Sequence, residues 1–213
     1  MVRLIANGGF EPSVSQKRAR EIMDGNYFGI EEAIAHYGVN PSRRELAALA
    51  EVPFTEEVLE AAKATHILVA VFPLSILDIR GKVERALFYG HEDAWYNKQA
   101  FAKDRGETMW HLISKTPVEN STSRNWDDQQ SLLAKDEETP TARVMTYTIV
   151  GHFKATGERL FERVYVRCSD FDSFGRRVRV GDFDSRGLSV SGDGSGDGLR
   201  LGLLGLASAR KFS

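Results

Sequence analysis

The carboxy-terminal quarter of the chain alternates apolar and polar residues, and a period of two requires strands rather than helices. Two valines alternate with two arginines at 177–180, and residues 188–191 repeat the pattern with serines. A strand of this kind turns one face to a core and the other to solvent. We therefore expect the polar residues of both segments to share one solvent-facing side. These residues are Arg177, Arg179, Ser189 and Ser191.

Before residue 160, apolar residues recur every three to four positions, which predicts helices. Thr141 is placed to begin the longest helix, and Gly38 and Gly157 are placed to end two of them. Asn40 is expected to cap a helix that starts at Pro41. The predicted helices span about 14–23, 29–38, 41–51, 55–62, 83–89, 93–103, 125–134 and 141–156, with strands at 66–72, 108–114 and 205–212.

Charge and cysteine content narrow the function classes. The chain has 28 Lys and Arg against 30 Asp and Glu, a net charge of −2, which offers no general attraction for nucleic acid. A single cysteine, Cys168, excludes an internal disulfide and a multi-cysteine zinc site. The amino terminus lacks the features of a secretory signal, and no apolar run is long enough to span a bilayer. We expect a cytoplasmic protein without membrane insertion.

No motif in the chain indicates catalysis. The five histidines form no HxH or HExxH pair, and phosphate-binding glycine loops are absent. The paired acids at 127–128 and 137–138 fit helix ends, where carboxylates interact with the helix dipole. We therefore predict no catalytic residue, no metal site and no cofactor, and we favour a ligand-binding protein over an enzyme.

The glycine-rich segment 191–198 leaves a calcium-binding alternative open. Its closely spaced aspartates are similar to the turns of calcium-binding β-rolls, in which carboxylates and carbonyls ligate the ion. Such turns occur in stacked repeats, and this chain has one copy. The other interpretation is an exposed loop that tolerates substitution.

Residue types are strongly biased between Arg163 and Arg210. These 48 residues contain no Lys, Glu, Gln, Met or Trp, although these types fill 37 of the other 165 positions. None of the five can be reached from an AAC or AAT codon by replacing only its adenines. Asp, Gly, Ser, Arg, Leu and Phe, which are abundant in this segment, all can be reached in that way.

With this bias, the sequence resembles the variable proteins of diversity-generating retroelements, whose carboxy-terminal codons are rewritten by adenine-directed mutagenesis. The matching residues are 165–169, Gly175, 181–183, 187–188 and 205–211, with 110–115 and 121–126 upstream. The resemblance covers about residues 108–213 and implies a C-type-lectin-like domain, related in fold to formylglycine-generating enzymes. The enzyme chemistry of that fold uses two cysteines, and Cys168 stands alone.

The resemblance implies an α+β fold: a mainly helical region, 1–107, packed on a lectin-like domain, 108–213, with two main helices and antiparallel strands. It also implies a hypervariable surface at about 170–204 that binds a macromolecule, expected to be a protein. A solvated face without a partner is the plainer alternative. The implied ligand-binding positions are Asp170, Phe171, Asp172, Phe174, Arg176, Arg177, Arg179, Asp182, Asp184, Arg186, Ser189, Ser191, Gly192, Asp193, Gly194, Ser195, Gly196, Asp197, Gly198 and Arg200.

Overall fold

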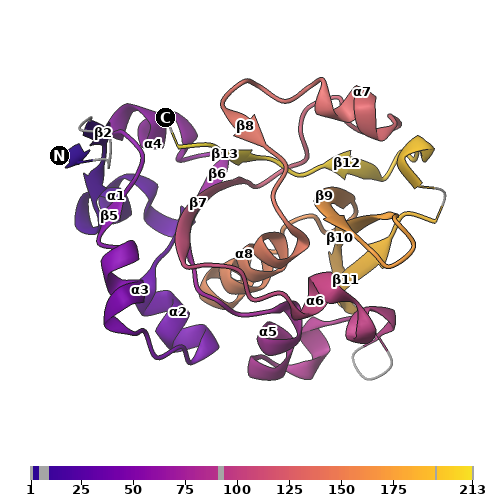
Figure 1. Cartoon of the computed structure of the whole chain (residues 1–213), viewed down its shortest axis with the longest axis horizontal. Helices are drawn as coiled ribbons and strands as arrows, with labels where there is room; N and C mark the ends of the chain where they lie inside the picture. Colours follow the sequence, from indigo (N-terminus) through magenta and orange to yellow (C-terminus); the bar gives the residue numbers. More distant parts are fainter. Residues whose placement is uncertain (1, 5–9, 91–93, 195, 213) are drawn as a thin grey trace.

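Helix α8 (Ala142–Thr156) runs through the middle of the molecule (Figure 1). The computed structural model describes residues 2–4, 10–90, 94–194 and 196–212. The Thr141 side chain caps the helix by accepting a hydrogen bond from the Val144 N–H, and Gly157 ends it with a φ of +79°, as the sequence predicts. Every residue from Ala142 to His152 is buried, so protein surrounds the helix for most of its length.

Two sheets lie on either side of α8. Their strands are β4 (Tyr27–Phe28), β6 (His66–Val71), β7 (Met109–Ser114), β8 (Glu137–Glu138), β9 (Tyr165–Phe171), β10 (Arg177–Asp184), β11 (Gly187–Gly192), β12 (Leu204–Leu206) and β13 (Ala209–Arg210). One sheet has the order β4-β6-β7-β13-β8, and the other has the order β11-β10-β9-β12. The β4–β6 and β9–β12 pairs are parallel, and the other pairs are antiparallel. The fold is therefore α+β.

Strands from both sides of residue 107 belong to the same sheet. β6 pairs with β7 over six residues, from His66 opposite Ser114 to Val71 opposite Met109. One continuous cluster of buried apolar residues includes members from both sides of residue 107. The amino-terminal region thus contributes strands as well as helices to the core that it shares with residues 108–212.

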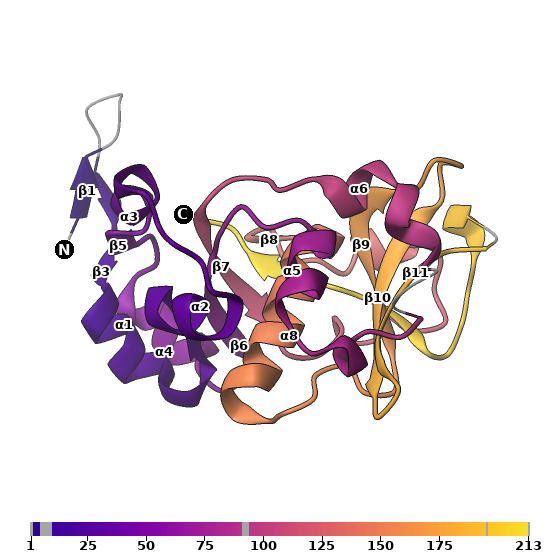
Figure 2. The same ribbon diagram turned by 90° about the horizontal axis from the view of Figure 1, so that it is seen from below.

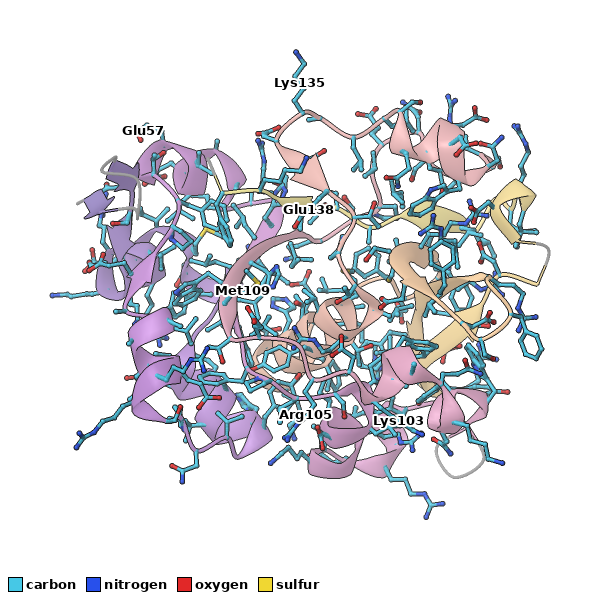
Figure 3. The ribbon with its side chains drawn as sticks, in the orientation of Figure 1. Glu57, Lys103, Arg105, Met109, Lys135 and Glu138 are labelled. Atoms are coloured by element: carbon cyan, nitrogen blue, oxygen red, sulfur yellow. The ribbon has the colours of Figure 1, made fainter. Side chains whose placement is uncertain are left out.

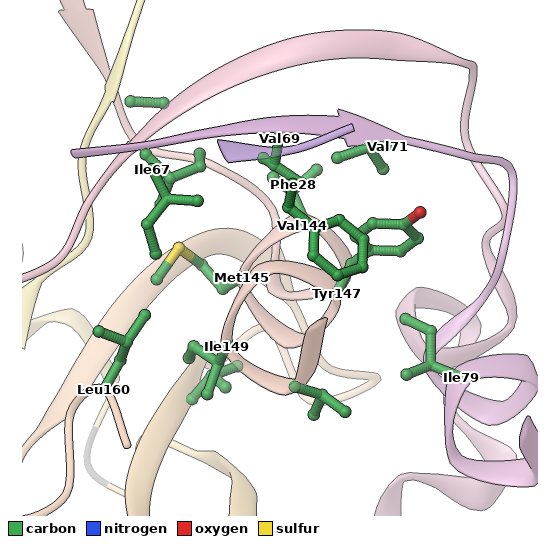
Figure 4. Close-up of a cluster of buried hydrophobic side chains, with 14 of the residues drawn as sticks. Phe28, Ile67, Val69, Val71, Ile79, Val144, Met145, Tyr147, Ile149 and Leu160 are labelled. Carbon is green, nitrogen blue, oxygen red and sulfur yellow. The ribbon is translucent and has the colours of Figure 1, made fainter. Parts of the chain in front are cut away.

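The centre of that core lies between β6 and α8. All six residues of β6 are buried, and its valines approach Val144 and Tyr147 of the helix (Figure 4). Tyr37 donates a hydrogen bond of 2.6 Å from its hydroxyl to the Tyr147 carbonyl. Gly151 permits this close packing, because a Cβ at that position would lie 2.9 Å from the Phe28 ring.

Short helices cover the amino-terminal side of the five-stranded sheet (Figure 2). The remaining helices are α1 (Gln16–Met23), α2 (Ile30–Tyr37), α3 (Arg43–Ala48), α4 (Glu56–Ala62), α5 (Ile76–Lys82), α6 (Ala100–Lys103) and α7 (Trp126–Gln130). Two further sheets have two strands each: β1 (Val2–Leu4) pairs with β2 (Phe10–Pro12), and β3 (Val14–Ser15) pairs with β5 (Glu51–Val52). The predicted cap at Asn40 is wrong. Ser42 caps α3 instead, in a reciprocal capping box with Glu45.

Two other sequence predictions in this region need correction. The helix predicted at 83–89 is only a short 3₁₀ turn, Arg85–Leu87. The true helix, α5, begins earlier because Ser75 and Asp78 form a capping box that the apolar pattern does not reveal. The predicted closing strand is also divided, since β12 joins the four-stranded sheet and β13 joins the five-stranded sheet.

Charged residues mark the edge of the five-stranded sheet at β8. This strand consists of two glutamates, and the nearby Lys135 reaches away from the ribbon into solvent (Figure 3). Charges on an edge strand oppose pairing with a second chain.

A buried imidazole makes the stability of this core depend on pH. The Nε2 atom of His111, on β7, is buried without a hydrogen-bond partner. Burial, with the nearby Arg143 guanidinium, lowers the pKa of His111 from 6.5 to about 4.

The unfolded chain protonates His111 more readily than the folded protein does. The stability that depends on a neutral His111 is therefore complete above pH 6.5 and is lost as the pH falls toward 4. The expected loss is about 3 kcal/mol in the free energy of unfolding. Urea denaturation over this pH range should therefore give a shallower pH dependence for His111→Gln than for the wild type. Parallel curves for the two proteins would contradict this assignment.

Candidate functional site

The polar residues of β9, β10 and β11 share one face of the four-stranded sheet, as the alternation predicts. Arg179 lies opposite Arg167 on β9 and Ser191 on β11, and Ser189 lies opposite Gly181. We call this side, with Arg177 and Tyr165, the β9–β11 face. The other side carries Val178 and Val180, which are fully buried, and it packs toward α8.

The β9–β11 face is not open to solvent as predicted. Arg177, Arg179, Ser189 and Ser191 are each only partly exposed. The loop that follows β11 folds back over the face, together with α7, and covers it. The predicted direction of these side chains is therefore right, and their exposure to solvent is only partial.

Arg167 anchors the covering loop. Its guanidinium donates to the Asp193 carboxylate at 2.5 Å and to the Leu199 carbonyl at 2.6 Å. It also donates to the Gln129 side chain at 2.9 Å and to the Arg124 carbonyl at 3.2 Å. The Arg167 and Asp193 side chains have no exposed surface. We call residues 193–199 the 193–199 loop, because this one side chain holds both of its ends.

Asp193 was predicted to be an exposed ligand contact, and this prediction is wrong. Its carboxylate is the buried partner of Arg167. Burial raises the pKa of the Asp193 carboxyl, and the Arg167 guanidinium opposes that rise. Gly194, Asp197, Gly198 and Arg200 are exposed as expected, whereas Gly192 and Gly196 are partly buried. Ser195, which was also predicted to contact ligand, lies outside the described residues.

Arg177 lies between two aromatic rings. Its guanidinium carbon is 3.7 Å from the centre of the Trp126 ring and 3.8 Å from that of Phe171. It also forms an ion pair of 3.3 Å with Asp197 of the 193–199 loop. Contact with two ring faces and a carboxylate holds this side chain in place, so it supports the β9–β11 face.

The turn between β9 and β10 presents two exposed phenylalanines. Phe171 is 48% exposed and Phe174 is 77% exposed. Asp172, which was predicted to contact ligand, is instead buried and accepts hydrogen bonds from the backbone N–H groups of Phe174 and Arg176. It therefore fixes the turn that displays the aromatic rings.

A β-bulge in β10 forms a small pocket at the opposite end of the face. The pocket has a volume of about 150 Å³ and is lined by Tyr89, Tyr165, Asp182, Asp184, Arg186, Gly187 and Ser189. Arg186 fills its mouth by pairing with Asp184 at 2.8 Å and with Asp182 at 3.3 Å. The Tyr165 hydroxyl donates to Asp182 or to Ser189, at 3.3 and 3.1 Å.

Asp170 has a structural role that the sequence did not reveal. Its carboxylate accepts a hydrogen bond of 2.5 Å from the Ala142 N–H in the first turn of α8. A carboxylate at this place satisfies an unpaired N–H group and interacts with the helix dipole. Burial raises the pKa of Asp170 despite this hydrogen bond.

The described residues contain no group of three or more His, Cys, Asp and Glu side chains that could hold a metal ion. Asp193 and Asp197 pair with arginines, which weighs against the calcium-binding alternative. Cys168 is fully buried, and burial raises the pKa of its thiol.

A larger cleft of about 550 Å³ lies beside α3, between Ser42 and Thr108, away from the β9–β11 face. Within residues 2–4, 10–90, 94–194 and 196–212, no helix has both the length and the apolar character needed to cross a bilayer.

Four further side chains shape the face without having been predicted: Tyr89, Tyr165, Trp126 and Arg167. The strand register could have placed Arg167 on the same side as Arg179, because both alternate with valines. Its burial could not have been predicted, since that depends on where the 193–199 loop folds.

Comparison with protein-family models, with curated proteins and with solved structures found no match for this chain.

The packing of Arg177 predicts a difference between two arginines of this surface. Arg177→Ala should lower the free energy of unfolding by about 1–2 kcal/mol, because it removes contacts with two rings and an ion pair. Arg200→Ala should change it by less than about 0.5 kcal/mol, since Arg200 forms only an exposed pair with Asp128. Urea denaturation of both variants measures the difference. Equal effects would mean that Arg177 does not support the face.

Proposed function

We propose that this protein binds a macromolecular ligand through a variable surface on a C-type-lectin-like scaffold, and that adenine-directed mutagenesis diversifies that surface. The residue-type bias between Arg163 and Arg210 is the observation that carries the proposal. The exposed members of the predicted set come from the end of β9 and the β9–β10 turn, the β10–β11 turn, and the 193–199 loop with Arg200. These segments all lie in the half of the molecule remote from α1 and α4, around the β9–β11 face (Figures 1 and 2).

The order of elements after residue 108 supports the lectin-like scaffold. The first strand, β7, pairs with the last, β13, so the two ends of this region meet. Between them come α7, α8 and the antiparallel strands β9, β10 and β11 of a second sheet. Two main helices and antiparallel strands are what the resemblance implies.

The exposed chemistry favours a protein ligand. Phe171 and Phe174 offer apolar area, and the Arg176 guanidinium lies 5.0 Å from the centre of the Phe174 ring. Exposed aromatic and arginine side chains are the residue types that dominate binding energy in protein interfaces. The pocket of about 150 Å³ is smaller than the sites that usually enclose a small molecule. Recognition here requires no catalytic group and no cofactor.

The proposed diversification predicts a second DNA copy of this region. Near the gene, we expect a non-coding repeat of codons 165–211 that differs from the coding copy at adenines of the repeat, together with a reverse-transcriptase gene. Sequencing the locus tests this. A repeat whose differences fall equally on all four bases would contradict adenine-directed mutagenesis.

A display library tests the recognition surface directly. Phe174, Arg186 and Arg200 would be randomised together, and folding would be measured by protease resistance. Most members should remain folded, since these side chains are exposed, and selection against a panel of proteins should yield binders.

The matched control is a library randomised at Val178, Val180, Leu188 and Val190, most of whose members should unfold. Equal loss of folding in both libraries would mean that the exposed positions are structural. A folded library that yields no binder would contradict the recognition function.

A further inference from the structure

A buried carboxylate lies between two arginines beneath the 193–199 loop. The Oδ2 atom of Asp193 accepts a hydrogen bond from Arg167, and the Oδ1 atom lies 3.9 Å from the Nε atom of Arg179. Both this Oδ1 and the Arg179 Nε are buried and have no hydrogen-bond partner. Tyr165 orients Arg179, whose guanidinium carbon is 4.6 Å from the centre of the ring. Two guanidinium groups thus converge on one carboxylate, and only one of them bonds to it directly.

Besides Arg167, the described part of the 193–199 loop is held by a 3₁₀ turn at Gly196–Gly198 and by the ion pair of Asp197 with Arg177. Gly194, Gly196 and Gly198 contribute no side chain, and Asp197 is exposed. Glycine also leaves the backbone free to adopt many conformations. Its ends are fixed by Arg167, through the Asp193 carboxylate and the Leu199 carbonyl.

We propose that Arg167 and Arg179 form a carboxylate-binding site, that the chain's own Asp193 occupies it, and that this contact sets the conformation of the 193–199 loop. Asp193 is then a positioning residue and not a ligand contact. A protein that carries a smaller residue at position 193 has an empty site whose two arginines take a free carboxylate, such as acetate or the side chain of an acidic residue. Only the description of the loop as part of a recognition surface rests on the proposed function.

The energetics of buried charge support this role. Arginine cannot lose its proton in a protein, so removing Asp193 leaves the buried Arg167 charged and without its carboxylate. Such a loss is strongly destabilising, because the charge has neither water nor a counter-ion. A small carboxylate that enters the space of the missing side chain replaces the counter-ion and restores the charge-assisted hydrogen bond.

Chemical rescue of Asp193→Ala tests the site. The variant should melt about 10 °C below the wild type in chloride. Acetate should raise its melting temperature along a saturating curve, beyond the effect of sodium chloride at equal ionic strength. Acetamide, which has nearly the same shape as acetate without the charge, should not raise the melting temperature of the variant. Hydrogen exchange at the Gly196 and Leu199 amides should speed up in the variant and slow again with acetate, since these amides bond within the loop.

Three matched variants complete the test. Asp193→Asn fills the space without a charge, so it should be destabilised and unresponsive to acetate. Asp197→Ala removes an exposed carboxylate of the same loop and should be neither destabilised strongly nor rescued. Arg179→Ala in the Asp193→Ala background should weaken the apparent affinity for acetate.

The proposal is overturned if acetate and chloride have the same effect on the melting temperature of Asp193→Ala. It is also overturned if acetate raises the melting temperature of Asp193→Asn as much as that of Asp193→Ala. An unchanged acetate affinity without Arg179 overturns the two-arginine site. If Asp193→Ala does not fold in chloride, acetate must restore folding, and its failure to do so also counts against the site. No ligand of the protein is needed in these measurements, so their failure would leave the proposed recognition function standing.

Discussion

The burial of α8 on all sides determines where every other part of this protein can lie. A helix whose residues from Ala142 to His152 are all buried must be packed by protein in every direction. The two sheets provide part of that packing, with β6 on one side and β9 and β10 on the other, and helices α2, α5 and α6 provide the rest. Because each sheet uses one face for α8, the polar face of β9, β10 and β11 is directed away from the core. The position of the candidate surface thus follows from the helix.

Paired charges make that polar face rigid. Arg167 and Arg177 each contact a carboxylate of the 193–199 loop, and Arg186 contacts Asp182 in the β10 bulge. The planar guanidinium offers five donors in fixed directions, so one arginine can join a strand, a helix and a loop. Arg167 does so by bonding to Gln129, Asp193 and Leu199. The exposed residues therefore project from a backbone that is held from beneath.

The sequence predicts the direction of side chains on a strand better than it predicts their exposure. Alternation correctly placed Arg177 and Arg179 opposite Val178 and Val180, because the geometry of a strand is local. It could not indicate that a distant glycine-rich loop covers them, or that Asp193 is buried there. Helix α8, with its cap at Thr141 and its end at Gly157, lies where the sequence predicts. The prediction of a helix at 83–89 is wrong because apolar spacing alone does not define where a helix starts.

Adenine-directed mutagenesis, as proposed, would act on codons without regard to burial. The segment it covers includes glycine positions at which the fold does not tolerate a side chain. A Cβ at Gly181 would lie 2.2 Å from the Val164 carbonyl oxygen, and the backbone there has a φ of +143° that other residues rarely adopt. A Cβ at Gly187 would lie 2.8 Å from the backbone of Phe88. A codon without adenine at such a position is protected from change, so the useful variation would be confined to exposed sites such as Phe174, Arg186 and Arg200.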